Sequence, residues 1–253
     1  MTEGRVSAVR LPDRTTYFAL ARSPRYSILF ALPLLVAYEA LAAVLSTADG
    51  GLRNGADVLL RTLFAAGAGP RGSLALMATV ILIGAGLVVR DLKRSRAGLR
   101  ARVFALMFLE ACGIAAVFGT VVGAVTTTLL GSFSALSIVQ PAQAGPATGL
   151  MLSLGAGLYE ELFFRVLLVS GLATAARALL GVGRIPAGVF ATVIGALIFS
   201  AFHYVGPFGD RFQLGSFAFR AISGVVFSAL YLLRGFGITA WAHALYDVLV
   251  MLF

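Results

Sequence analysis

The chain has 253 residues, of which 59% are hydrophobic and 12% are charged, and its mean hydropathy is +0.94. An ordinary soluble domain has about 45 to 50% apolar and about 25% charged residues, so this composition excludes a water-soluble globular protein. The net charge is +9, but the basic residues form short clusters beside long apolar stretches, not a stripe with interleaved aromatic residues. We therefore expect a polytopic protein that has the lipid bilayer as its partner and does not bind nucleic acid.

Seven apolar stretches are long enough to cross about 30 Å of hydrocarbon as helices. They lie near residues 27–45, 72–89, 104–130, 147–172, 187–206, 215–233 and 237–253. The stretch 52–66 has an apolar face but carries Arg53, Asp57 and Arg61, so we expect a helix on the membrane surface there, or else a solvated loop helix. The sequence predicts an all-α fold of about seven transmembrane helices.

The distribution of Lys and Arg predicts the orientation. Fourteen of the 20 basic residues lie on the N-terminal segment and on loops of the same side, and four lie on the opposite side. The positive-inside rule then places the N-terminus in the cytoplasm. The first 25 residues have no short apolar stretch with a cleavage site, so we expect no removable signal peptide. Nineteen arginines against one lysine favour a bacterial source, and hence the bacterial inner (cytoplasmic) membrane.

Several ionisable residues fall inside the apolar stretches. A charge at mid-bilayer costs at least about 2.5 to 3.5 kcal/mol on insertion scales, so such residues are functional candidates. Both histidines of the chain are among them: the set is Glu39, Glu110, Glu160, Glu161, Arg165, His203, Arg220, His243 and Asp247. We expect Glu39 and Glu110 to be structural, one of them pairing with Arg220 or closing a cavity.

The spacing of these residues indicates a common site. Glu161 and Arg165 are four residues apart, so they share a helix face and can form an ion pair. His243 and Asp247 have the same spacing, while Glu160 points about 100° away from Glu161. Acids and histidines that converge in an apolar interior can deprotonate a water molecule and stabilise a developing oxyanion. The pattern therefore favours hydrolysis in a polar intramembrane cavity.

Three strings of the C-terminal part carry a family resemblance. They are Tyr159-Glu160-Glu161-Leu162-Phe163-Phe164-Arg165, Phe199-Ser200-Ala201-Phe202-His203 and His243-Ala244-Leu245-Tyr246-Asp247. In order and spacing they resemble the EExxxR, FxxxH and HxxxN/D motifs of the CPBP family of glutamic intramembrane proteases, which includes type II CAAX prenyl endopeptidases and bacteriocin-processing and abortive-infection proteins. The resemblance implies a catalytic core of four transmembrane helices over residues 147–253. Residues 1–146 would hold the cytoplasmic segment, three transmembrane helices and the surface helix of the same structural unit.

The resemblance also implies roles. Glu160, as general base, and His203 would activate the water, while His243 and the residue at 247 would form an oxyanion site. Glu161, Arg165 and Phe199 would position the helices or contact substrate. Many members have asparagine where this chain has Asp247, and an ionised aspartate cannot donate a hydrogen bond. Either Asp247 is protonated, or it orients His243; we favour the second alternative.

Rival chemistries have less support in the sequence. The HExxH motif of zinc proteases, a GxSG serine motif and a GxGD aspartate are all absent from it. Zinc held by Glu160, His203, His243 and Asp247 is an alternative, as is a non-enzymatic transporter or immunity scaffold. We expect an endopeptidase that needs no cofactor and no metal and acts on a membrane-anchored or exported peptide or protein.

Overall fold

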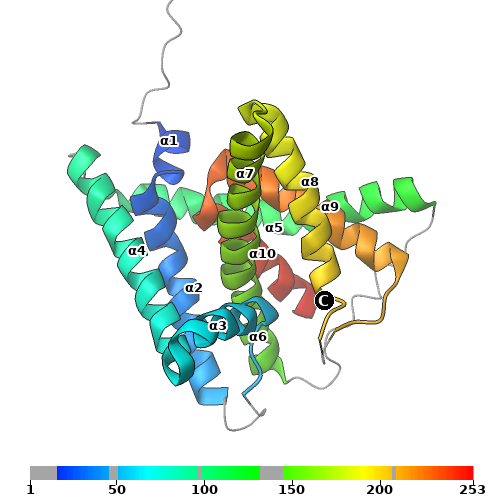
Figure 1. The fold of residues 1–253 in the computed structure, drawn as a ribbon, viewed down its shortest axis with the longest axis horizontal. Coiled ribbons are helices and arrows are strands. Elements are labelled where there is room, and N and C mark those ends of the chain that lie inside the picture. Colours follow the sequence, from blue (N-terminus) through cyan, green and yellow to red (C-terminus); the bar gives the residue numbers. More distant parts are fainter. Residues whose placement is uncertain (1–15, 46–50, 96–97, 132–144, 207–208, 253) are drawn as a thin grey trace, which may run out of the picture.

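The computed structural model describes residues 16–45, 51–95, 98–131, 145–206 and 209–252. Within these ranges every regular element is a helix, which confirms the all-α fold (Figure 1). The helices are α1 (Tyr17–Ala21), α2 (Pro24–Leu45), α3 (Gly55–Ala68), η1 (Gly69–Arg71), α4 (Gly72–Ser95), α5 (Ala101–Leu130), α6 (Pro146–Gly155), η3 (Ala156–Val169), α7 (Ser170–Leu180), α8 (Arg184–Phe202), α9 (Leu214–Arg234) and α10 (Phe236–Leu252).

Each of the seven apolar stretches corresponds to helix. Six helical segments of the described chain are long and apolar enough to cross a membrane, and α10 is a shorter apolar helix. The fourth stretch is longer than predicted, because α6, η3 and α7 follow one another without a break over residues 146–180. The protein is therefore a polytopic integral membrane protein.

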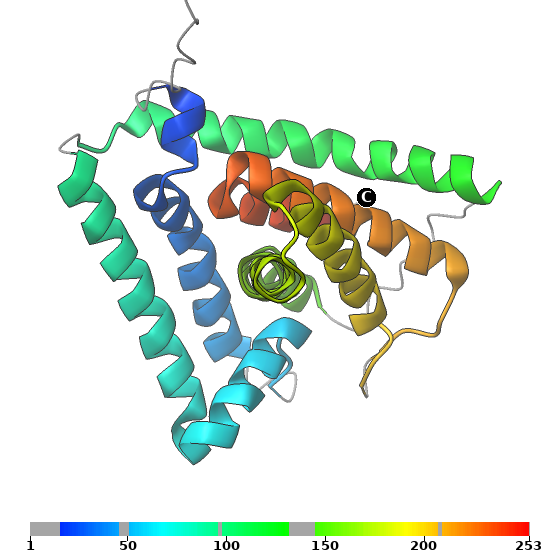
Figure 2. The same ribbon diagram turned by 45° about the horizontal axis from the view of Figure 1, so that its top comes forward.

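This continuous helix is the centre of the fold. Figure 2 looks almost along it and shows α2, α3, α8 and α10 arranged around it. In particular, η3 packs against α3, α8 and α10, while α6 packs against α2 and α10. Side chains on η3 can therefore meet side chains from both the N-terminal and the C-terminal parts of the chain.

Two glycines allow the close approach of these helices. A Cβ atom on Gly157 would lie 2.3 Å from the carbonyl oxygen of Ala240, so η3 and α10 could not pack at their present distance with a larger residue there. A Cβ atom on Gly155 would lie 2.4 Å from the ring of Tyr38 and 2.9 Å from Cβ of Asn54. Glycine at these positions brings α10 and the start of α3 against the central helix.

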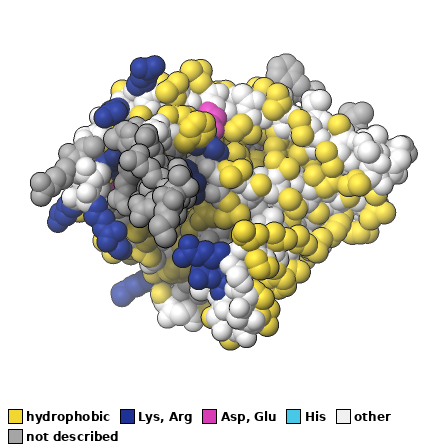
Figure 3. Space-filling model, turned by 90° about the horizontal axis from the view of Figure 1, so that it is seen from above, with side chains coloured by type: hydrophobic (Ala, Val, Ile, Leu, Met, Phe, Trp, Pro, Cys, Tyr) yellow, Lys and Arg dark blue, Asp and Glu magenta, His cyan; other side chains and the backbone are white. Residues whose placement is uncertain are grey.

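Charged and apolar side chains separate on the surface. Figure 3 shows Lys and Arg gathered on one part of the face, while hydrophobic side chains cover much of the rest of it. In Figure 1 α1, the end of α4 and the α7–α8 turn lie at the same end of the molecule. Exposed basic residues of these segments are Arg22, Arg90, Lys93, Arg94, Arg177 and Arg184. Loops that the charge count placed on one side of the membrane thus lie together.

The expected pairing of Arg220 with Glu39 or Glu110 was wrong. Arg220 instead forms an ion pair with Asp210, at 2.5 Å, and Glu110 forms one with Arg234, also at 2.5 Å. The ion-pair partners of Glu39 lie on α3 and just before it. Partners close in space but distant in sequence cannot be identified from helical spacing, which relates only residues of one helix.

Candidate active site

Three of the expected site residues lie on η3. This segment is wound as a π-helix over fourteen residues, a conformation that is rare and is frequent at functional sites. Glu160, Glu161 and Arg165 are 7%, 0% and 1% exposed, respectively. Buried charges need partners, so the residues around η3 define the site.

Glu160 contacts a residue from outside the three motifs. The amide Nδ2 of Asn54, immediately before α3, donates a hydrogen bond of 2.8 Å to Oε1 of Glu160. Within the described ranges no other hydrogen bond reaches this carboxylate, which leaves Oε2 able to accept one from a water. Glu160 also interacts electrostatically with His203 and His243. The carboxylate thus lies among both histidines of the chain.

His203 lies at the end of α8. This helix ends at Phe202, with His203 as its C-cap, four residues earlier than the predicted end at 206. The backbone turns there, and Gly206 has a positive φ of 92°; Pro207 lies outside the described residues. Nδ1 of His203 is 2.9 Å from the carbonyl oxygen of Phe199. Since a carbonyl only accepts, this bond assigns the proton of the neutral ring to Nδ1 and leaves Nε2 as the basic nitrogen.

His243 is held between two carboxylates. Its Nδ1 donates to Oε1 of Glu161 at 2.7 Å, while its Nε2 lies 3.7 Å from Oδ2 of Asp247. The ring stacks on Phe227, with centroids 4.4 Å apart. The first contact is a hydrogen bond and the second is too long to be one. Glu161, and not Asp247, therefore occupies the position from which the ring is oriented.

Arg165 and Phe199 connect the motifs. Nε of Arg165 lies 3.2 Å from Oε2 of Glu161, and its guanidinium carbon lies 4.3 Å from the centroid of Phe199. The Phe199 ring also meets the rings of His203 and His243 edge on, at 5.0 and 6.3 Å. A cation over an aromatic face is stabilised electrostatically, so Phe199 supports the buried charge and also contacts both imidazoles.

A group of four charges lies beside Asn54 and is here called the α3 charge cluster. Arg53 contacts Asp57 at 2.7 Å and Glu39 at 3.1 Å, and Arg61 contacts the same two acids at 2.6 and 2.7 Å. Asp57 is fully buried. The charges that argued against a span in 52–66 are thus paired with one another, and α3 packs against η3 with Asp57 inside.

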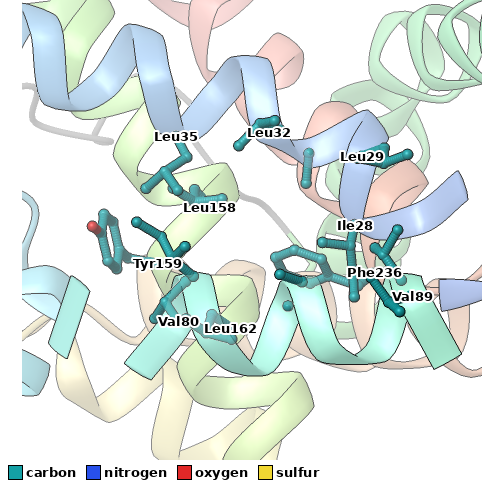
Figure 4. Close-up of a pocket in the computed structure, with 15 residues that line it drawn as sticks. Ile28, Leu29, Leu32, Leu35, Val80, Val89, Leu158, Tyr159, Leu162 and Phe236 are labelled. Atoms are coloured by element: carbon teal, nitrogen blue, oxygen red, sulfur yellow. The ribbon is translucent and has the colours of Figure 1, made fainter. Parts of the chain in front are cut away.

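An apolar recess lies on the other side of η3. It has a volume of about 340 Å³ and lies between α2 and α4, with Leu158, Tyr159 and Leu162 of η3 on its wall (Figure 4). The side chains that line it are almost entirely apolar. Since Glu160 and Glu161 do not line it, η3 separates this recess from the polar site.

The structure brings the candidate residues of the three motifs together. Glu160 interacts with both histidines, Glu161 binds His243 and Arg165, and Asp247 lies one turn from His243. Sequence reasoning missed Asn54 and the π-helical winding. Asn54 belongs to a polar segment 106 residues before Glu160, and nothing in its surroundings distinguished it from an ordinary helix cap.

A zinc site would need several donor side chains close together. Within the described part of the chain, no three or more His, Cys, Asp or Glu side chains are arranged so that they could hold a metal ion. The four residues named for zinc do not form such a group.

Comparison with known proteins shows a similarity to one family model. Residues 142–249 match the family model described as Type II CAAX prenyl endopeptidase Rce1-like. No curated protein and no solved structure matches the chain. The matched range contains all three motifs, the helices η3 and α8, and most of α10. Residues 142–249, less than half of the chain, are thus similar to the Rce1-like family of type II CAAX prenyl endopeptidases, and this similarity indicates a peptidase.

Proposed function

We propose that the protein is a glutamic intramembrane endopeptidase, in which Glu160 and His203 activate a water that hydrolyses a peptide bond. One observation supports this most directly: the carboxylate of Glu160, buried and fixed at one oxygen by Asn54, lies within electrostatic reach of both histidines. Because a buried charge is costly in a membrane protein, such a cluster calls for a chemical role.

In the first step Glu160 is the general base. Its Oε2 accepts a proton from the water while the basic Nε2 of His203 accepts a hydrogen bond from the other water hydrogen. The water oxygen forms a bond to the carbonyl carbon of the substrate, and the carbonyl oxygen becomes an oxyanion. The Phe199 carbonyl holds the His203 ring in the tautomer that this step needs.

In the second step the tetrahedral intermediate collapses. A proton on Nε2 of His243 donates a hydrogen bond to the oxyanion, while Glu161 fixes the ring from the opposite nitrogen. The carbon–nitrogen bond then breaks, and the protonated Glu160 gives its proton to the leaving amine. The products are a new carboxyl group and a new amino group. Asp247 lies close enough to His243 to stabilise its charged form by Coulomb attraction.

The substrate we propose is a membrane-anchored or exported peptide or protein, since the site lies among membrane-spanning helices. The proposed location is the bacterial inner membrane with the N-terminus in the cytoplasm. This orientation rests on the gathering of Lys and Arg at the end that holds α1 and the α7–α8 turn.

The test is a comparison of new peptide termini in the membrane proteome of cells that carry the wild type, Glu160→Gln or His203→Ala. We expect termini that are present with the wild type and absent with both variants, at equal protein levels in the membrane. Identical sets of termini in all three strains would contradict the proposal.

A further inference from the structure

Asn54 is the residue of the site that lies outside the three motifs and outside the range of the family match, residues 142–249. The residue is buried, at 7% exposed. Two hydrogen bonds use its two ends: Nδ2 donates to Oε1 of Glu160 at 2.8 Å, and Oδ1 accepts from the backbone N–H of Ala56 at 2.9 Å. Rotating the amide by 180° would place Oδ1 against a carboxylate, so both bonds require the orientation observed.

The backbone of Asn54 is fixed independently of its side chain. Its N–H donates to Oη of Tyr38 at 3.1 Å, and this hydroxyl donates to Oδ2 of Asp57 at 2.9 Å. Asp57 belongs to the α3 charge cluster. Tyr159, the residue before Glu160, donates its hydroxyl to Glu39 of the same cluster at 2.7 Å. The cluster therefore holds both the donor residue and the chain segment that carries the acceptor.

We infer that Asn54 is a positioning residue for the general base, and that it fixes the Glu160 carboxylate so that Oε2 faces the water. The inference rests on the proposed function. A carboxylate at the end of a side chain with three rotatable bonds has many rotamers, and a hydrogen bond to one of its oxygens selects among them. A displacement of about 1 Å in a reacting group can lower a rate about 100-fold. The N-terminal part of the chain would thus complete the catalytic site.

The double role of Asn54 allows a test that separates positioning from helix capping. Asn, Asp and Ser are about equally good N-caps, so Asn54→Ser and Asn54→Asp both keep the cap of α3. Serine is too short to donate to Glu160, and aspartate replaces the donor by a second negative charge. A pure capping role predicts equal activities for the wild type and both variants. A positioning role predicts that activity falls from the wild type to Asn54→Ser and again to Asn54→Asp.

The activity arm uses as its probe the purified membrane protein that shows the strongest new terminus dependent on the wild type. We expect kcat to fall about 10- to 100-fold in Asn54→Ser and further in Asn54→Asp, with KM unchanged in both. Thr62→Ala, an exposed change on the same helix, should match the wild type. Equal activities, or losses that fall on KM or follow the melting temperature, would overturn the inference while leaving the role of Glu160 intact.

The second arm does not depend on catalysis. Melting temperatures of the wild type, Asn54→Ser, Glu160→Ala and the double variant in one detergent form a double-mutant cycle. If the two side chains are coupled, the melting temperature of the double variant falls by less than the sum of the falls in the two single variants. Strict additivity would overturn the inference. If no terminus depends on Glu160, the proposed function fails, and this cycle alone decides whether Asn54 holds the carboxylate.

Discussion

One carboxylate connects a histidine and an arginine: Glu161 accepts a hydrogen bond from Nδ1 of His243 at 2.7 Å through Oε1, and its Oε2 lies 3.2 Å from Nε of Arg165. The two partners come from different helices, α10 and η3. Glu161 is fully buried, so water cannot replace either contact unless the fold opens. In the proposed mechanism this carboxylate orients the groups around the reacting centre.

Replacing this carboxylate should destabilise the protein. In Glu161→Ala the guanidinium of Arg165 stays buried without its ion pair, and breaking a buried pair from one side typically costs about 3 to 5 kcal/mol. We expect a clear loss of melting temperature together with a loss of proteolysis. The double variant Glu161→Leu/Arg165→Met is the control, since it removes both charges. It should regain much of the stability but not the activity; equal stability of the single and double variants would contradict the prediction.

Loss of the residues proposed to activate the water should strongly lower the rate of proteolysis without affecting insertion. We expect Glu160→Ala and His203→Ala each to lower the rate by about 100- to 10,000-fold, the contribution typical of general acid and base catalysis. The measurement is cleavage of the identified substrate in membranes that contain equal amounts of each variant. Full activity of either variant would show that the water is activated elsewhere.

The contact between η3 and α10 should tolerate no side chain at position 157. A Cβ atom in Gly157→Ala would lie 2.3 Å from the carbonyl oxygen of Ala240, which forces the helix carrying His243 away. We expect a lower melting temperature and a lower rate. Gly171→Ala is the matched control, because a Cβ atom there meets nothing within 4 Å and alanine is a better helix former by about 1 kcal/mol. Equal effects of the two changes would exclude the packing explanation.

Chelation should leave the activity intact, since the proposed base is a carboxylate and the proposed mechanism needs no metal. The rate is measured before and after treatment with EDTA or phenanthroline, and again after zinc is added. Inhibition that zinc reverses would favour the zinc-dependent alternative.

The docking of α1 should depend on pH at the alkaline end. Burial and the neighbouring Glu110 carboxylate raise the pKa of Tyr17 from 10.0 to about 12, and the Tyr17 hydroxyl donates to Glu110 at 2.5 Å. Because the folded state retains this proton more strongly than the unfolded state, the contribution to stability is complete below pH 10 and is lost as the pH rises through about 12. The melting temperatures of the wild type and Tyr17→Phe should become equal as the pH rises through this range. A difference that stays constant with pH would disprove the role of the Tyr17 hydroxyl.

The sequence predicted those features of the fold that depend on interactions within a single helix. Apolar length alone predicted the seven helical stretches, because a membrane-spanning helix must satisfy its own backbone. The motif residues meet as their four-residue spacings indicated, for example Glu161 with Arg165. The π-helical winding of η3 was not predictable, since the motif was read with α-helical spacing. The contact of Asn54 with Glu160 depends on how α3 folds back onto the central helix, which no local pattern records.

The α3 charge cluster contains two acids and two arginines, so its net charge is zero. Each charge lies within about 3 Å of an opposite one, well inside the Debye length of about 8 Å at physiological ionic strength, so dissolved ions add little screening to these pairs. The wall beside Glu160 thus contains its own counter-ions. The rate of hydrolysis should consequently change little between low and high salt.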